Sequence, residues 1–305
     1  MKKEDIITII QNQYSISINN FKVIPRLMFR ESFYFDDDNG RKYVIKKYPK
    51  STEDQELVSI IRFYSELCHY GTITNKIVFD RDKNAVFELA DGKYVIFTYL
   101  EGEKCNIANF KLSYGSALKS LHNSLCTMDT NLAGLSTQEQ VNQCIANIND
   151  WEEIDELSSM IIGMTAETLK ACKNYQTSTL SIIHGDCTRN NCIITDNKIT
   201  FIDFDNFKTG DPLEDLANAA NSVLYDDEIP LTSDKENTII HIFSDYGLQR
   251  NEFERVKNYM KINCVIELYK HRENYRYLRR TPGTKNYLGK LIGIFNSVNY
   301  SLLQL

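Results

Sequence analysis

The hydrophobic pattern of this 305-residue chain changes its period near residue 101, and that change limits the folds available to it. Before this point, short apolar and aromatic segments separated by turn residues predict β-strands with one helix among them. Beyond it, apolar residues recur at helical spacing over 112–125, 151–175, 213–224 and 253–275. The sequence therefore predicts an α+β protein with two lobes. Residues 1–100 form a small lobe with an antiparallel sheet, and residues 101–305 form a larger, mainly helical lobe.

A hairpin is the clearest local feature of the first lobe. Asn39-Gly40 separates the segment 33–35 from 42–46, and both turn residues tolerate the positive φ that a tight hairpin needs. A helix is expected next. The hydroxyl and acidic residues of 51–54 mark its start, and Gly71 marks its end. Further strands are predicted at 76–79, 85–89 and 94–100. The expected order is strand, strand, helix, strand, strand, strand.

Three strands are predicted within the helical lobe, and polar residues follow two of them. We expect 181–183 and 192–194 to pair, with 199–202 close behind. His184-Gly185-Asp186 follows the first, and Asn191 stands five positions after Asp186. Asp203 follows the third, at the end of an apolar run that could hold it rigidly.

These residue types suit phosphoryl transfer. That reaction needs a carboxylate to orient and deprotonate a hydroxyl, oxygen ligands for Mg²⁺ and a cation on the phosphates. Protein kinases place an asparagine five positions after the catalytic aspartate and a lysine on an upstream strand. Here Lys46 ends the strand Tyr43-Val44-Ile45-Lys46. Because side chains alternate along a strand, Val44 and Lys46 share one face and Lys47 points to the other.

With these motifs the chain resembles the superfamily of aminoglycoside phosphotransferases and choline kinases, whose fold is protein-kinase-like. The resemblance is specific over residues 184–217. It is carried by His184-Gly185-Asp186, Ile202-Asp203-Phe204, Gly210-Asp211-Pro212, Asp215-Leu216-Ala217 and, upstream, Leu121-His122.

The resemblance implies a role for each matching residue. Asp186 is then the catalytic base, Asn191 and Asp203 bind Mg²⁺, and Lys46 holds the phosphates of ATP, with GTP as the alternative nucleotide. Val44 contacts the adenine, and Ser32 donates to a phosphate. A hinge formed by Phe97, Thr98, Tyr99 and Leu100 offers backbone groups to the adenine. Asp215 braces the catalytic loop, and His184 is structural.

Three positions leave alternatives open. The turn near 28–32 has no glycine, unlike the glycine-rich loop of protein kinases. The acidic partner of Lys46 is Glu53 or Glu56, of which Glu56 is preferred. Asp205 stands where protein kinases have the glycine of Asp-Phe-Gly, and is either a second metal ligand or an acid at a strand end.

The amino-acid composition limits which classes of partner the protein can bind. A net charge of −6 argues against a nucleic-acid binder, since such proteins need a positive field. We expect no membrane span, because no apolar run reaches the length of one. The 8 cysteines form no Cys-x-x-Cys pair, which favours free thiols over a zinc site. Free thiols are typical of a cytoplasmic protein. We expect the protein to be a monomer or a dimer.

The leading hypothesis is therefore an ATP- and Mg²⁺-dependent kinase that phosphorylates a hydroxyl of a small molecule. An amino alcohol, an amino sugar or aminoglycoside, and a sugar-like metabolite are all candidate acceptors. The alternative is a catalytically weak or inactive protein on the same scaffold, of the spore-coat type. A protein kinase is disfavoured, because the interval between Asp203 and Asp215 leaves almost no room for an activation segment.

Overall fold

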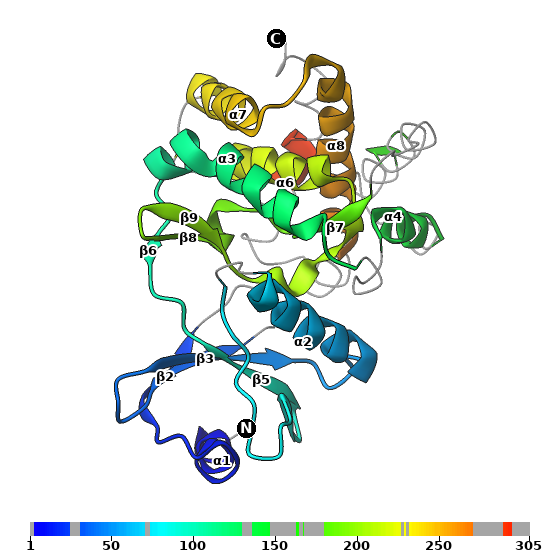
Figure 1. Cartoon of the computed structure of the whole chain (residues 1–305). Coiled ribbons are helices and arrows are strands. Elements are labelled where there is room, and N and C mark those ends of the chain that lie inside the picture. Colours follow the sequence, from blue (N-terminus) through cyan, green and yellow to red (C-terminus); the bar gives the residue numbers. More distant parts are fainter. Residues whose placement is uncertain are drawn as a thin grey trace. The chain divides into compact units, whose positions relative to one another are not determined.

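The computed structural model describes residues 3–24, 31–70, 74–129, 136–146, 163–164, 167, 180–226, 229, 232–270 and 289–294. The chain divides into two compact units, residues 1–102 and 103–305 (Figure 1). The first is built around an antiparallel sheet and the second is mainly helical, so the predicted α+β architecture is confirmed.

The first unit contains a five-stranded antiparallel sheet in the order β1-β2-β3-β5-β4. Its strands are β1 (Asn19–Ile24), β2 (Ser32–Asp36), β3 (Lys42–Tyr48), β4 (Val86–Leu89) and β5 (Gly92–Thr98). Two helices accompany it, α1 (Lys3–Ile9), which continues as the π-helical turn η1 (Ile10–Tyr14), and α2 (Asp54–His69). In Figure 1, α1 and α2 lie on opposite faces of this sheet.

The β2–β3 hairpin forms as its turn sequence predicts. Asp37 stabilises the turn, because its Oδ1 accepts hydrogen bonds from the backbone N–H groups of Asn39 and Arg41, both at 2.8 Å. Gly40 has a φ of 75°, which a glycine adopts without strain. The turn chemistry thus fixes the register of β3, the strand that carries Lys46.

Two predictions for this unit differ from the structure. The segment 76–79 is not a full strand, since only Ile77 forms a β-bridge, with Phe97. The N-terminal helix α1 is not predicted by the sequence pattern, because seven residues give its apolar spacing too little length to stand out. It is held by packing, for Ile6, Ile10 and Tyr14 are buried against the sheet.

The two faces of the sheet differ. One carries the aromatic core, in which Phe35 and Tyr43 stack with ring centroids 4.9 Å apart. The other faces α2, whose residues Leu57, Ile60, Phe63, Tyr64 and Leu67 are buried at helical spacing. The predicted helix is thus confirmed, and it covers the face on which Lys46 lies.

The described residues of the second unit form two small sheets and several helices. The strands β6 (Glu103–Lys104), β8 (Cys192–Thr195) and β9 (Lys198–Phe201) form one sheet, while β7 (Ser181–Ile183) pairs with β10 (Lys208–Gly210). The helices are α3 (Ile107–Leu125), α4 (Thr137–Ala146), α6 (Pro212–Tyr225), α7 (Thr232–Tyr246) and α8 (Phe253–Lys270). Short 3₁₀ turns lie at Arg189–Asn191, Phe204–Asn206 and Arg250–Glu252.

The helices predicted near 112–125, 213–224 and 253–275 correspond to α3, α6 and α8, and the one at 151–175 falls mainly outside the described residues. Helix α3 begins earlier than predicted because the Asn106 side chain caps it, accepting from the Asn109 N–H at 2.9 Å. The expected pairing of 181–183 with 192–194 is wrong. A local hairpin takes the second strand instead, since β8 turns directly into β9, and β7 pairs with the later strand β10.

Close packing brings α3 against α7. A Cβ added at Gly115 would stand 2.3 Å from the carbonyl oxygen of Ile242, so only glycine fits at this crossing.

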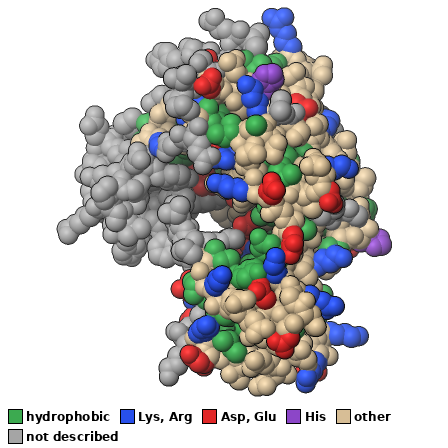
Figure 2. All heavy atoms as spheres, turned by 90° about the vertical axis from the view of Figure 1, so that its left-hand side faces the viewer, with side chains coloured by type: hydrophobic (Ala, Val, Ile, Leu, Met, Phe, Trp, Pro, Cys, Tyr) green, Lys and Arg blue, Asp and Glu red, His purple; other side chains and the backbone are tan. Residues whose placement is uncertain are grey.

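No helix in the part of the chain that the structure describes is long and apolar enough to cross a bilayer. On the face drawn in Figure 2, basic and acidic side chains are interspersed over the described residues.

Candidate active site

Lys46 lies in a largely apolar setting on β3. Its side chain is 9 % exposed, and its Nζ lies 3.3 Å from the Tyr64 hydroxyl oxygen of α2. The ring centroids of Tyr64 and Phe97 lie 5.6 and 5.1 Å from the same Nζ. Aromatic faces attract a cation, so these rings partly offset the cost of burying the ammonium group.

The other nucleotide-binding candidates of β2 and β3 share this face. Ser32 stands opposite Lys46 in the β2–β3 register, and Val44 stands opposite Phe97 in the β3–β5 register. Ser32 is buried and Val44 is half-buried. Lys47 points away, as the alternation predicts, and its Nζ forms ion pairs with Glu31 and Asp91 at 3.0 and 2.8 Å.

The expected contact between Lys46 and Glu56 is not formed in the described part of the chain. Glu56 is exposed near the start of α2, whereas the buried stripe of that helix continues through Tyr64. Glu53, the other acid considered, is exposed as well. The phenol oxygen of Tyr64, two turns further along α2 than Glu56, contacts the Lys46 Nζ instead. A search for acidic partners overlooks a tyrosine.

The segment Phe97–Leu100 leaves one backbone donor for a ligand. The N–H groups of Thr98 and Tyr99 donate to the carbonyl oxygens of Lys76 and Lys42, at 2.7 and 2.8 Å. The next N–H, that of Leu100, makes no hydrogen bond to any residue that the structure describes. If this segment is a hinge, Leu100 is the residue whose N–H is available to an adenine.

The loop that follows β7 holds Asp186 and Asn191 together. The Asn191 Nδ2 donates to the Asp186 carboxylate at 2.8 Å and to the Asp186 carbonyl at 3.0 Å. The carboxylate and the carbonyl have no hydrogen to donate, so they can only accept. The amide must therefore turn its NH₂ toward them, which leaves its Oδ1 for another partner. The same asparagine can therefore orient the carboxylate and ligate a cation.

Asp215 of α6 organises the backbone of this loop. Its Oδ2 accepts from the His184 N–H and its Oδ1 from the Gly185 N–H, both at 2.8 Å, and the His122 Nε2 lies 3.0 Å from Oδ2. Complete burial acts to raise the pKa of Asp215, but these hydrogen bonds and the charge interaction with His122 outweigh it and lower that pKa. The bracing role expected of Asp215 agrees with this geometry.

Gly185 is required by the same packing. It has a φ of 78°, and a Cβ at this position would stand 2.0 Å from the carbonyl oxygen of Asn206. The glycine of the His-Gly-Asp triplet thus permits the close approach of two loops, namely the loop of Asp186 and the turn just after Asp203.

His184 ties the loop of Asp186 to the chain that carries Asp203. Its Nε2 lies 3.1 Å from the Ile202 carbonyl oxygen, and its Nδ1 accepts from the Asp186 N–H at 3.3 Å. This pattern fixes the neutral tautomer with the proton on Nε2. Burial lowers the pKa of His184, which also favours the neutral form. A structural role for His184 therefore fits its contacts.

Asn191 and Asp203 leave the same end of the β8–β9 hairpin. Cys192 pairs with Phe201, and the Ile202 N–H donates to the Asn191 carbonyl at 2.9 Å. Asp203 itself has a φ of 67°, in the left-handed region. This conformation is rare for residues other than glycine and is common at functional sites.

The oxygen donors at this hairpin end fit a magnesium ion. Mg²⁺ prefers oxygen ligands and is usually held by one or two carboxylates together with phosphates and water. Asn191 Oδ1 and the Asp203 carboxylate supply such donors. The described residues contain no group of three or more His, Cys, Asp or Glu side chains able to hold a metal. A magnesium ion held in this way usually takes its remaining ligands from phosphate and water oxygens. Asp205 lies half-buried in the adjoining 3₁₀ turn, and its role stays a prediction.

A cavity of about 520 Å³ opens beside Asp186 within the second unit. Its lining is polar and comes from the loop of Asp186, from α6 and from α8. The lining residues are Lys104, Gly185, Asp186, Thr188, Arg189, Asn190, Asn218, Asn221, Ser222, Tyr225, Asp226, Asn263 and Glu267. A pocket of this size suits a small molecule.

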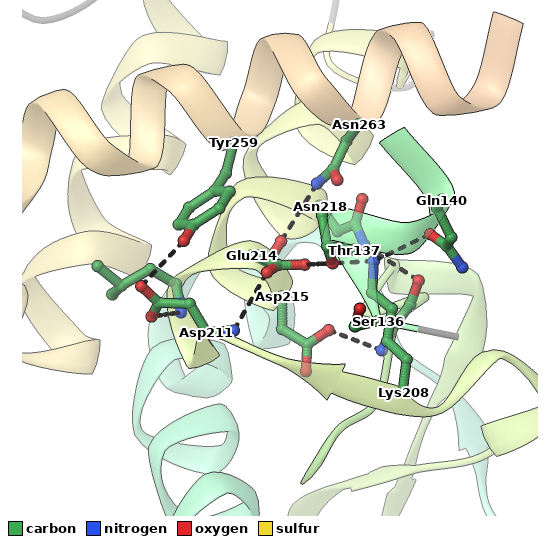
Figure 3. A network of polar contacts seen from close by, with 12 residues as sticks. Ser136, Thr137, Gln140, Lys208, Asp211, Glu214, Asp215, Asn218, Tyr259 and Asn263 are labelled. Atoms are coloured by element: carbon green, nitrogen blue, oxygen red, sulfur yellow. Dashed lines mark hydrogen bonds and ion pairs between the residues drawn. The ribbon is translucent and has the colours of Figure 1, made fainter. Parts of the chain in front are cut away.

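A buried polar network supports the start of α6 behind this cavity (Figure 3). The Glu214 carboxylate accepts from the Thr137 hydroxyl of α4 and pairs with the Lys208 Nζ at 3.2 Å. Asp211 accepts from the Tyr259 hydroxyl of α8 at 3.1 Å. Burial raises the pKa of Glu214, although the Lys208 charge opposes the rise. These contacts join α4, α6 and α8.

Sequence reasoning overlooked the amide residues of the cavity and the Arg189–Asp226 ion pair, whose Nη2 and Oδ2 atoms lie 2.8 Å apart. One pattern could have indicated the amides. Asn218, Asn221, Ser222 and Tyr225 recur at helical spacing on α6, a helix whose other residues are largely buried and apolar. A polar stripe on such a helix indicates a polar cavity.

Comparison with known proteins agrees with this arrangement. A family model described as the phosphotransferase enzyme family matches residues 28–235. No curated protein matches significantly. Three solved structures illustrate the fold. An amicoumacin kinase in complex with AMP-PNP, Ca²⁺ and amicoumacin is 12% identical, with 100% of this chain and 96% of that chain covered and a TM-score of 0.80.

The second is a microcompartment-associated aminopropanol kinase, 15% identical over 99% of this chain and 100% of that chain, with a TM-score of 0.75. The third is a spectinomycin phosphotransferase with ADP and spectinomycin, 14% identical over 100% of this chain and 99% of that chain, with a TM-score of 0.68. At such identities these structures show the fold. The family model covers more than half of the sequence and includes Lys46, Asp186, Asn191 and Asp203, so the chain belongs to the phosphotransferase enzyme family.

Proposed function

We propose that this phosphotransferase moves the γ-phosphate of ATP to a hydroxyl group of a small molecule. One observation carries the proposal. Asp186, whose carboxylate accepts from the Asn191 amide at 2.8 Å, lines a polar cavity of about 520 Å³. Such a cavity accommodates a small hydroxylated compound, with the carboxylate in its wall as a proton acceptor.

The nucleotide is assigned to the first unit. Lys46 binds the phosphates, Ser32 donates to one of them, and Val44 with Phe97 packs against the adenine. The hinge continues through Thr98, Tyr99 and Leu100, where the Leu100 N–H reads the edge of the base. ATP is the nucleotide expected, with GTP as the alternative. Ligands of similar structures support an adenine nucleotide as the phosphate donor, since they include AMP-PNP and ADP.

The acceptor is assigned to the second unit, where Asp186 is the general base. It accepts the proton of the substrate hydroxyl as the oxygen attacks the γ-phosphorus and the ADP oxygen leaves. Asn191 orients the Asp186 carboxylate and, with Asp203, holds Mg²⁺. When bound, this ion neutralises charge on the phosphate oxygens. Asp215 and His184 keep the loop in place without touching the substrate.

The direct test is a screen for ADP release over amino alcohols, aminoglycosides, amino sugars and simple sugars, with Mg²⁺ present. We expect at least one compound to be phosphorylated and Asp186→Ala to lower its turnover by about 10²–10⁴, the usual contribution of a general base. Asp186→Asn is the matched control, because it keeps the shape but not the basicity.

Two results would contradict the proposal. Turnover by Asp186→Ala at the wild-type rate would remove Asp186 from the chemistry. Nucleotide binding without any phosphorylated product over the whole panel would favour the structural, spore-coat-type alternative.

A further inference from the structure

A fully buried tyrosine of α3, Tyr114, contacts the loop of Asp186. Its hydroxyl donates a hydrogen bond to the carbonyl oxygen of Cys187, the residue that follows Asp186, at 2.8 Å. No other residue that the structure describes donates to this carbonyl. Burial raises the pKa of Tyr114 far above its ordinary value, so the hydroxyl keeps its proton and remains a donor.

The ring of Tyr114 contacts the strand that leads to Asp203. Its centroid lies 5.5 Å from that of Phe201, in a T-shaped arrangement, and 4.3 Å from that of Phe110 on the same helix. Phe201 is the last residue of β9 and stands two positions before Asp203. A single side chain therefore supports the segment of Asp186 through its hydroxyl and the segment of Asp203 through its ring.

Aromatic packing alone does not account for the hydroxyl of Tyr114. A phenylalanine has the same ring and could make the same contacts with Phe110 and Phe201. Burying a hydroxyl carries a desolvation cost, and the hydrogen bond that offsets this cost adds only a modest net stabilisation. The distinctive consequence of the hydroxyl is therefore directional, because it fixes where the Cys187 carbonyl points.

The Cys187 carbonyl is the last of three consecutive carbonyl groups that side chains hold around Asp186. The Gly185 carbonyl accepts from the Asn218 Nδ2 at 3.2 Å, and the Asp186 carbonyl accepts from the Asn191 Nδ2 at 3.0 Å. Because a peptide group is planar, holding its carbonyl oxygen sets the orientation of the whole group. The three donors come from α6, from the loop itself and from α3, so the backbone around Asp186 is fixed from several parts of the fold.

We propose that Tyr114 is a positioning residue for phosphoryl transfer, which holds Asp186 in register with the segment that carries Asp203. This inference rests on the proposed function, from which it takes the roles of Asp186 and Asp203. Tyr114 is not among the described residues that line the cavity, so it acts through the loop and does not touch the acceptor. Loss of its hydroxyl should impair the chemical step and leave acceptor binding intact.

The variant Tyr114→Phe tests this, because it removes the hydroxyl and keeps the ring. A misplacement of about 1 Å can cost about 10²-fold in rate, and the loop keeps its contacts with Asp215, so we expect kcat to fall about tenfold. The acceptor KM should change by less than about twofold, since no binding contact is lost. Tyr94→Phe is the matched control. The Tyr94 hydroxyl donates to Asp91 at the same 2.8 Å, within the first unit, and its loss should leave kcat unchanged.

A double-mutant cycle separates positioning from general structural damage. In a chain that carries Asp186→Asn, no basic carboxylate remains to be positioned, so adding Tyr114→Phe should lower turnover little further. An equal fractional loss in both backgrounds overturns the proposal. So does a Tyr114→Phe variant with the wild-type kcat, which would leave the proposed function intact, and so does a raised acceptor KM with an unchanged kcat.

Hydrogen–deuterium exchange tests the same contact without turnover. The N–H groups of Thr188 and Asn191 donate within the loop at 2.9 and 3.0 Å. Both should exchange faster in Tyr114→Phe than in the wild type, and at the wild-type rate in Tyr94→Phe. Unchanged exchange in Tyr114→Phe overturns the proposal. A wild-type chain that phosphorylates none of the screened acceptors contradicts the proposed function, and the exchange rates then decide separately whether Tyr114 holds the loop.

Discussion

Lys46 in the first unit and Asp186 in the second are held in place by different forces. Lys46 lies between aromatic rings, with the Tyr64 hydroxyl oxygen 3.3 Å from its Nζ. Asp186 lies on a loop whose backbone is fixed by hydrogen bonds to one buried carboxylate, that of Asp215. Apolar packing distributes its stabilisation over many contacts, whereas a buried polar network depends on every member. The second unit should therefore tolerate single substitutions less well than the first.

The largest effect is expected from Asp215→Ala. It leaves the buried N–H groups of His184 and Gly185 and the His122 side chain without their acceptor. Breaking such a buried charged site costs about 3–5 kcal/mol of the free energy of unfolding. Turnover should fall as well, since the loop of Asp186 loses its position. Urea unfolding and ADP release measure the two effects.

Asp215→Asn is the control, because it keeps one acceptor oxygen. It should be less destabilised than Asp215→Ala and retain part of the activity. An alanine variant with wild-type stability would show that the network does not position the loop.

The Lys208–Glu214 pair offers a second way to break the polar scaffold. Lys208→Met leaves the Glu214 carboxylate buried without its cation, and burial already raises the pKa of Glu214. We expect a loss of about 3 kcal/mol, in the range for removing one partner of a buried pair. The measurement is again urea unfolding at pH 7.

The double variant Lys208→Met/Glu214→Gln separates charge from packing. Replacing both charges should recover most of the lost stability, because no buried charge remains. If the double variant is as unstable as Lys208→Met alone, the cost arises from packing around Lys208 and not from the uncompensated charge of Glu214.

The pH dependence of stability provides a third test. Burial lowers the pKa of His184 in the folded chain below its value of about 6.5 in the unfolded chain. The unfolded state then binds more protons between these two pKa values, so stability is full above pH ~6.5 and falls as the pH drops through this window. Urea unfolding between pH 7.5 and 5 should show this decline, and His184→Gln should flatten it. A variant slope equal to that of the wild type would contradict a buried, neutral His184.

Local sequence predicted the polar loop better than its surroundings. The proximity of Asp186, Asn191 and Asp203 could be predicted because strand ends and short spacings bring them together within one stretch of chain, and their roles stay a prediction. The amide residues of the cavity were missed because Asn218 and Asn263 come from helices that are distant in sequence. Only tertiary packing brings these two side chains to one cavity.

In the first unit, the strand alternation correctly separated Lys46 from Lys47, since it depends on backbone geometry alone. The expected contact between Lys46 and Glu56 is not formed in the described residues, because such a contact depends on how α2 is rotated against the sheet. That rotation is set by the whole apolar stripe of α2, which buries Tyr64 and leaves Glu56 in solvent.

The smallest effect is expected from Tyr64→Phe, which removes the phenol oxygen beside Lys46 and keeps the ring. A neutral hydrogen bond contributes about 0.5–1.5 kcal/mol, and the retained ring and that of Phe97 would still attract the ammonium group. We expect a loss of about 1 kcal/mol in stability and a rise of a few-fold in the KM for the nucleotide, with kcat nearly unchanged. Tyr64→Leu, which also removes the ring, should cost more on both measures. If Tyr64→Phe were as damaging as Asp215→Ala, Lys46 would depend on a polar network after all, and the contrast between the two units would not hold.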